Sequence, residues 1–380
     1  MHVADVSGAV VPTPESSDEA EAGPMTLRRP TAEVTEKVAE MRRALEGAEK
    51  ALVLTHDNPD PDAIASAAGL AFLIERTCGI PTTLAFGGII GRAENRAVME
   101  ELDIPFERIE GLELEGGTAC ALVDTQPGAG NNSLPRGCAA TVVLDHHPAR
   151  PESEDSPFAD IQPEYGASAS MIVEYIRAAQ LEPERKLATA LFYGIQSETM
   201  DLGREASEAD VAASVFLYPR TDPAAISRIR HARVPRGVYR SFHEGLERAW
   251  SRGDVVFVPL GGLEYPDLVA QLADMFLKVH GVDWVIAAGR YQEGLLISVR
   301  AHLPDAHAGD LVQGVVGDRG SAGGHGEMAG ARIGLQDVND GNAEILIDEL
   351  FDDFAAALEV ADLPRESLID VDSADSGPTS

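Results

Sequence analysis

Three short apolar runs in this chain are each followed at once by acidic or histidine side chains. The runs cover residues 51–54, 119–123 and 141–144, a length typical of buried strands in an α/β sheet. In an open sheet of that kind the ligand crevice lies outside the carboxyl ends of the strands, so we expect the residues that follow the runs to meet there. They are His56, Asp60 and Asp62 after the first run, Asp124 after the second, and Asp145, His146 and His147 after the third.

The chemistry of this group indicates a metal site. Carboxylate oxygens together with imidazole nitrogens suit divalent Mn or Mg, or Zn. A single Asp after a strand is usually a loop residue or a helix cap, and Asp62 could simply cap the helix that follows. An isolated pair of histidines is more often a surface feature. Five or six such residues at three successive strand ends nevertheless favour a metal-dependent hydrolase.

Helical and strand patterns alternate along the first two thirds of the chain. This alternation predicts an α/β fold with a parallel sheet and crossover helices. A further strand is expected near 82–86, and helices are expected at 31–49, 62–77, 167–180, 185–196, 207–217 and 222–230.

A smaller α/β unit is expected after a weakly patterned stretch. We divide the chain into a first domain at 31–234 and a second at 235–361, and we expect disorder at 1–30 and 362–380, which are polar and acidic. The second unit is predicted to contain a connector helix at 238–250, strand 254–260, helix 265–279, a hairpin at 282–289 and 294–301, helix 308–316, a glycine-rich segment at 317–330, strand 329–335 and helix 343–359.

The chain is strongly acidic. Asp and Glu total 63 against 30 Lys and Arg, which gives a net charge of −33, and only four of the basic residues are Lys. Such a surface normally argues against polyanionic partners. The composition, however, resembles that of proteins from salt-accumulating halophiles, and at molar salt a Debye length of about 3 Å removes the long-range field. The net charge therefore indicates a high-salt environment and does not identify the substrate.

Other features of the sequence indicate where in the cell the protein is found. No apolar run approaches the ~20 residues needed to span a bilayer, so no membrane partner is expected. The N-terminus lacks the basic-then-apolar pattern of a signal peptide, and either Met1 or Met25 could start translation. Three cysteines without a CxxC pair do not indicate a disulfide scaffold, so we predict a cytoplasmic protein.

Taken together, the motifs resemble the DHH phosphoesterase superfamily, which is named after the tripeptide at 145–147. The first motif runs from His56 to Asp62. The resemblance extends from about residue 50 to about residue 345, with its motifs in the expected order. Further matching residues are Asn58, Pro59 and Ser66 in the first half, and Ser298, Val299, Arg300, Gly323, Gly324, His325, Ala329 and Gly330 in the second, which resemble the DHH-associated substrate-binding domain (DHHA1).

The resemblance implies a hydrolytic centre with two divalent ions, Mn in the first place and Mg as the alternative. Asp124 would bridge both ions, and water activated between them would attack phosphorus. His147 would contact the scissile phosphate, and Asp145 would orient His146. The resemblance assigns one ion to His56 and Asp60 and the other to Asp62 and His146.

The fourth motif departs from the family pattern. Members of the family usually have a helix that ends in Ser/Thr-Asp-Thr, whose Asp binds the second ion. Here the run from Gly194 to Asp201 places Glu198 at that position, one methylene longer. Asp201, three residues later, could serve instead if the chain turns locally. A third alternative is that neither residue binds metal.

The second domain is expected to bind the substrate. Gly323 and Gly324 have no Cβ and would allow a phosphate or base to approach the backbone closely. His325 could donate to a phosphate, and Arg300 offers a bidentate fork suited to one. Gly-Gly-His by itself also fits a flexible turn.

We therefore expect a two-domain phosphoesterase whose active site lies in the cleft between the domains. Its length and lack of extra modules favour the nanoRNase type, with 3′-phosphoadenosine 5′-phosphate (pAp) phosphatase activity. Alternatives are a cyclic di-AMP phosphodiesterase, a RecJ-like single-strand exonuclease, and a non-catalytic nucleotide-binding protein. The expected partner is a short nucleic acid or nucleotide, and members of this family are often homodimers.

Overall fold

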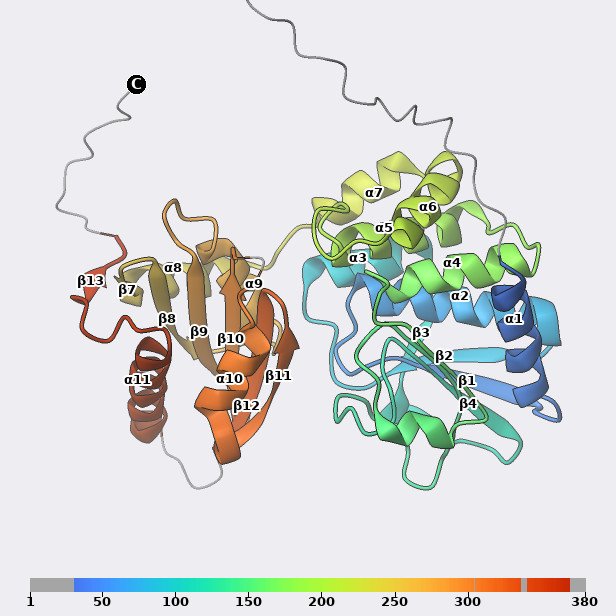
Figure 1. Ribbon diagram of the computed structural model, residues 1–380, viewed down its shortest axis with the longest axis horizontal. Coiled ribbons are helices and arrows are strands. Elements are labelled where there is room, and N and C mark those ends of the chain that lie inside the picture. Colours follow the sequence, from blue (N-terminus) through green and yellow to red (C-terminus); the bar gives the residue numbers. More distant parts are fainter. Residues whose placement is uncertain (1–30, 304, 336–339, 370–380) are drawn as a thin grey trace, which may run out of the picture.

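The computed structural model describes residues 31–303, 305–335 and 340–369. The first half of the chain contains a six-stranded parallel sheet (Figure 1). The strand order is β3-β2-β1-β4-β5-β6, so the order reverses between β1 and β4. This arrangement confirms the expected α/β class with a parallel sheet. The strands are β1 (Lys50–Leu54), β2 (Thr82–Phe86), β3 (Phe106–Arg108), β4 (Thr118–Val123), β5 (Ala140–Asp145) and β6 (Phe158–Ile161).

Helices cover one face of this sheet (Figure 1). The helices of this half are α1 (Ala32–Ala44), α2 (Pro61–Cys78), α3 (Ala93–Leu102), α4 (Ser168–Ala178), α5 (Arg185–Glu198), α6 (Glu208–Leu217) and α7 (Pro223–Arg230). Of these, α6 and α7 form an outer layer packed on α3, α4 and α5. Helix α2 packs against α4 and α5, and this close approach requires Gly69, because a Cβ there would lie 2.4 Å from Ile172 Cγ2. The other face of the sheet is covered by Ile109 and by loop residues between Leu112 and Cys138. The first core therefore fixes the ends of β1, β4 and β5 relative to α2 and α4.

The second half of the chain contains a seven-stranded, mostly antiparallel sheet in the order β11-β12-β10-β9-β8-β7-β13. Helices α8 and α9 pack on one face, and α10 and α11 pack on the other. The elements are α8 (Arg236–Arg248), β7 (Trp250–Arg252), β8 (Val255–Gly262), α9 (Leu268–Phe276), β9 (Trp284–Tyr291), β10 (Gly294–Ala301), α10 (Ala308–Val316), β11 (Gly320–His325), β12 (Met328–Gly334), α11 (Asp340–Ala357) and β13 (Glu366–Ser367).

Two segments differ from the sequence-based expectations. The glycine-rich segment 317–330 contains strand β11, which pairs antiparallel with β12. Small residues without alternating polarity give no strand signal, so only the hydrogen-bonded partner reveals this strand. Residues 362–369, expected to be disordered, include β13, which pairs with β7, and Arg365, whose guanidinium lies 4.1 Å from the Trp250 ring centroid. The disorder expected at 1–30 and 370–380 concerns residues outside the described ranges.

No helix within the described ranges combines the length and the apolar composition that a membrane-spanning segment needs.

Candidate metal centre

The carboxyl ends of β1, β4 and β5 bring the sequence-predicted residues to the point where the strand order reverses. Asp60 begins α2 as its N-cap, since its Oδ1 accepts a hydrogen bond from Ala63 N at 3.0 Å. Asp124 follows β4 directly and has a φ of +58°, a left-handed conformation that Asp tolerates better than most residues. Reversal points of this kind are the usual ligand crevices of α/β sheets.

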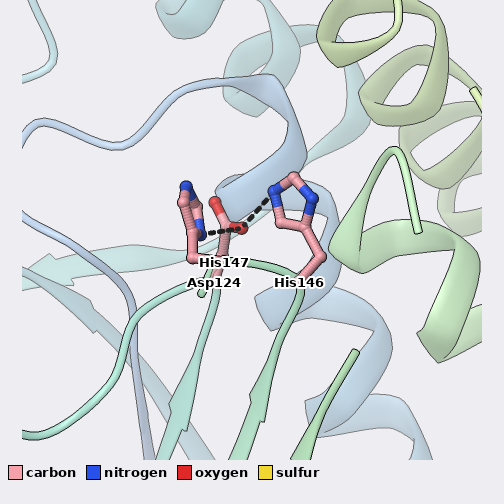
Figure 2. Close-up of side chains that lie close together, drawn as sticks. All are labelled: Asp124, His146 and His147. Carbon is pink, nitrogen blue, oxygen red and sulfur yellow. Dashed lines mark ion pairs between the residues drawn. The ribbon is translucent and has the colours of Figure 1, made fainter. Parts of the chain in front are cut away.

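Asp124 lies at the centre of the group and is almost completely buried (Figure 2). Its Oδ1 lies 3.5 Å from His146 Nε2 and 3.8 Å from His147 Nδ1. Its Oδ2 lies 3.5 Å from His56 Nε2. Ser168 Oγ at the start of α4 donates to Oδ1 at 2.9 Å. One carboxylate is thus shared by three imidazoles, one from the segment after β1 and two from adjacent residues after β5.

Two overlapping sets of ligand atoms result, and Asp124 belongs to both. One set is Asp124, His146 and His147, and the other is His56, Asp60 and Asp124; within each, the candidate ligand atoms all lie within 4.8 Å of one another. In the second set, His56 Nε2 lies 3.8 Å from Asp60 Oδ2. Imidazole nitrogens and carboxylate oxygens are the donors that divalent transition ions accept, so the residues present fit the expected metals.

Backbone carbonyl groups orient the imidazole rings of His56 and His146. His56 Nδ1 lies 2.9 Å from the carbonyl oxygen of Asp57, and His146 Nδ1 lies 3.1 Å from that of Tyr165. A carbonyl can only accept, so each Nδ1 carries the proton. Each Nε2 is therefore the nitrogen that faces Asp124. Hydrogen bonds of this kind fix the tautomer of metal-binding histidines.

The expectation that Asp145 orients His146 is wrong. Asp145 Oδ1 accepts from His147 Nδ1 at 2.8 Å and from His147 N at 3.2 Å. The cause is the chain direction after β5, which turns the backbone of His147 back over the Asp145 side chain. Asp145 therefore positions His147, whose side chain is still 41% exposed.

Gln126 is a residue that motif reasoning missed. Its Nε2 donates to Asp145 Oδ2 at 2.8 Å, and its Oε1 accepts from Arg150 N at 2.8 Å and from Ser153 Oγ at 2.9 Å. This buried amide fixes the carboxylate that holds His147. The only available sequence signal is its place two residues after Asp124 at a strand end.

In this centre the carboxylates and the imidazoles each favour the charged form of the other. Burial alone would raise the pKa of Asp124, but the hydrogen bond with His56 and the charges of the three imidazoles hold it well below its usual range. Burial favours neutral imidazoles, yet Asp124 and Asp60 raise the pKa of His56 to about 10. Asp145 and Asp124 likewise outweigh burial and raise the pKa of His147 to about 9. Without other cations, the imidazoles themselves compensate the buried Asp124 charge.

Asp62 is buried beside this centre but belongs to neither set of ligand atoms. Its two oxygens accept from the backbone nitrogens of Ser168 and Ala169 at 2.8 and 2.9 Å, at the N-terminus of α4. Burial raises the pKa of its carboxyl well above the usual value, and the nearby charges of Asp124, Asp60 and Glu198 raise it further. Its predicted metal-binding role remains a prediction.

The structure separates the two candidates of the fourth motif. Glu198, the last residue of α5, is half-buried, and its pKa is raised to about 7 first by burial and then by the charge of Asp60, with His146 opposing. Asp201 is exposed and pairs with Arg230 Nη2 at 2.8 Å. Glu198 is therefore the candidate within electrostatic range of the centre.

The second-domain candidates make their described contacts with residues of the second domain. Arg300 on β10 donates from Nε to Asp274 Oδ1 at 2.6 Å, and its side chain is only 12% exposed. Gly323 and Gly324 lie on β11. At Gly324, with a φ of +147°, a Cβ would lie 2.4 Å from Ala329 Cα, so the hairpin itself requires glycine there. His325 ends β11, and its side chain lies outside the described part of the structure.

Fold and site together define a two-sheet α/β protein with a buried carboxylate–histidine centre of metal-binding type. The sequence model of the DHH family, N-terminal domain, matches residues 50–195, which contain this centre. Residues 50–195 therefore correspond to the N-terminal domain of the DHH family.

An uncharacterized protein of Methanocaldococcus jannaschii is 32% identical over 286 residues, which are 75% of this chain. The chain spans 58% of the length of that relative. Among solved structures, an exopolyphosphatase-related protein from Bacteroides fragilis matches with a TM-score of 0.60 and 13% identity, covering 85% of this chain and 98% of that one. Exonuclease RecJ bound to manganese matches with a TM-score of 0.43 and 15% identity, covering 90% and 97%.

Proposed function

We propose that this protein is a metal-dependent phosphoesterase that hydrolyses short oligonucleotides or nucleotide phosphoesters, of the nanoRNase and pAp phosphatase type. The observation that carries the proposal is the pair of ligand sets that share Asp124. A carboxylate has two oxygens and can serve both sets at once, as metal pairs about 3.5–4 Å apart require.

His56 and Asp60 would hold one divalent ion, and His146 the other, with Asp124 common to both. Mn is the favoured metal, because imidazole nitrogens and carboxylate oxygens occur together, and Mg is the alternative. Ions bound there would supply Lewis-acid activation of water and neutralise charge on the phosphate.

His147 is placed to act on the substrate. Its Nδ1 is engaged by Asp145, which Gln126 in turn fixes, so the ring orientation is set before the substrate arrives. With Nδ1 donating to Asp145, Nε2 is the nitrogen that can donate to a phosphate oxygen. A fixed donor of this kind stabilises charge that develops on phosphate without reorganisation.

The second domain would select the substrate. The hairpin of β11 and β12 presents a nearly side-chain-free edge at Gly323 and Gly324, which suits the close approach of a base or phosphate. Arg300 on β10 would contribute a cation at the same end of the sheet, because Arg300 and His325 both pair with Met328 of β12.

The test is a hydrolysis assay in high-salt buffer with Mn, with Asp124→Asn as the inactive control. The panel contains a dinucleotide, a longer single strand, cyclic di-AMP, pAp, pyrophosphate and polyphosphate. Preference for the dinucleotide over the longer strand, together with pAp hydrolysis, is the expected result. Preference for another substrate would replace the proposed specificity. No hydrolysis by a protein that binds no Mn would favour a non-catalytic nucleotide-binding protein.

A further inference from the structure

A loop of the second domain packs directly against the first-domain loop that follows β2. A Cβ added to Gly91 would lie 2.3 Å from Tyr265 Cδ2, so the Tyr265 ring rests on the Gly91 backbone. The neighbouring Ile89 packs against the second-domain core that contains Tyr265. Arg92 Nη2 lies 3.6 Å from Asp274 Oδ2 on α9. These contacts place α9 and the loop before it beside the first domain.

The same first-domain loop is tied to the metal centre. Asn58, in the motif between His56 and Asp60, accepts from Ile89 N through its Oδ1 at 2.9 Å. The Asn58 backbone nitrogen also donates to the carbonyl oxygen of Gly87 at 3.1 Å. The second-domain loop thus contacts a first-domain loop that is hydrogen-bonded to the segment carrying two of the candidate ligands.

Asp267 is an acidic residue of that second-domain loop, immediately before α9. Its Oδ2 is buried and has no hydrogen-bond partner in the described part of the structure. Burial raises the pKa of its carboxyl, while the charges of Arg92 and His56 lower it and that of Asp60 raises it again. The charge of Asp267 therefore acts on both Arg92 and the His56–Asp60 side of the centre.

A buried carboxylate oxygen without a partner is costly unless a cation compensates it. Arg92 is shared with Asp274 and compensates Asp267 only in part. A divalent ion held by His56, Asp60 and Asp124 would add positive charge next to His56 and Asp60, whose charges already act on Asp267. Any interaction that is stronger when the ion is present raises the affinity for that ion.

We propose that Asp267 is a positioning residue contributed by the second domain, which strengthens binding of the divalent ion at His56, Asp60 and Asp124. This inference rests on the metal-dependent function proposed above. It makes the first-domain ion site incomplete without the second domain, because the compensating carboxylate comes from the loop before α9.

The test compares Asp267→Asn with the wild-type chain, and uses Glu264→Gln as a matched control. Glu264 is an exposed acid three residues away in the same loop, so its substitution removes the same charge without changing the buried carboxylate. Mn affinity is measured by calorimetric titration, and thermal unfolding is measured in EDTA and in saturating Mn.

Asp267→Asn should weaken Mn binding at the tighter site about 10–100-fold, the usual effect of removing a residue that supports metal ligands. In EDTA the variant should unfold at the wild-type temperature or above it, because an uncompensated buried charge has been removed. Its Mn-induced rise in the unfolding temperature should be smaller. Glu264→Gln should match the wild type in both measurements.

Unchanged Mn affinity in Asp267→Asn would overturn the inference. Equal destabilisation of the variant in EDTA and in Mn would also overturn it, since that result indicates a structural role alone. An equal loss of affinity in Glu264→Gln would show a general charge effect and overturn it as well. Failure of the wild-type chain to bind Mn would instead refute the proposed function.

Discussion

Replacing Glu198 by Gln tests both the electrostatics of the centre and the identity of the fourth-motif ligand. Glu198 is half-buried at the end of α5, and burial followed by the charge of Asp60 raises its pKa from 4.5 to about 7. Without metal, the ionised carboxylate therefore destabilises the folded state. Gln has the same shape but carries no charge, so it removes this penalty.

The size of the effect follows from the pKa. A rise from 4.5 to about 7 corresponds to at most about 3 kcal/mol. Because the side chain is partly exposed, solvent screening reduces the expected gain to about 1–2 kcal/mol. The unfolded state loses its proton near pH 4.5 and the folded state near pH 7, so the penalty is absent below pH 4.5, grows between these values and is constant above pH 7.

Urea unfolding in EDTA measures this gain. Glu198→Gln should be more stable than the wild type at pH 8, and the difference should shrink toward pH 4.5. In Mn the order should reverse, because the wild-type carboxylate then interacts with the ion. The affinity for Mn should fall about 10–100-fold in the variant.

Asp201→Asn is the matched control, three residues along the same chain. It weakens an exposed surface pair with Arg230 and keeps an oxygen that can accept from Gln196 Nε2, so it should change stability by about 0–1 kcal/mol and leave Mn affinity unchanged. The reasoning is refuted if Glu198→Gln is no more stable than wild type in EDTA at pH 8. It is also refuted if Asp201→Asn loses as much Mn affinity as Glu198→Gln.

Three other substitutions test separate parts of the site. Asp124→Asn should keep the fold but lower the hydrolysis rate below about a tenth of wild type, because both ligand sets need this carboxylate; a higher residual rate in steady-state assays would exclude that role. Arg300→Ala should raise KM for the substrate and free Asp274, and an unchanged KM would contradict substrate binding by Arg300. Gln126→Leu leaves Asp145 Oδ2 without its donor and should cost about 1–3 kcal/mol in urea unfolding, whereas an unchanged midpoint would show that the amide is dispensable.

Much of the centre could be predicted from the sequence because its residues follow strand ends. The apolar runs before His56, Asp124 and Asp145 correspond to β1, β4 and β5. Parallel strands align their carboxyl ends at one edge of the sheet, so the local sequence pattern was enough to predict that these residues lie close together. Figure 2 shows the outcome for Asp124, His146 and His147.

Pairings between individual side chains could not be predicted in the same way. Sequence spacing left Glu198 and Asp201 as alternatives, and only the turn after α5 places Asp201 at the surface beside Arg230. The spacing of Asp145 and its two histidines likewise did not reveal that Asp145 holds His147. These contacts depend on rotamers and on local chain direction, which adjacent residues alone do not fix.

The sequence by itself determined the fold class and the location of the centre, because strand length, apolar periodicity and the residues at strand ends are local properties of the chain. Tertiary structure alone decided which partner each buried group receives. Gln126 beside Asp145, and Asp267 in a loop that packs against the first domain, have no local signal. Burial removes water as an alternative partner, so the charge and hydrogen-bond state of each group depends on neighbours that only long-range packing supplies.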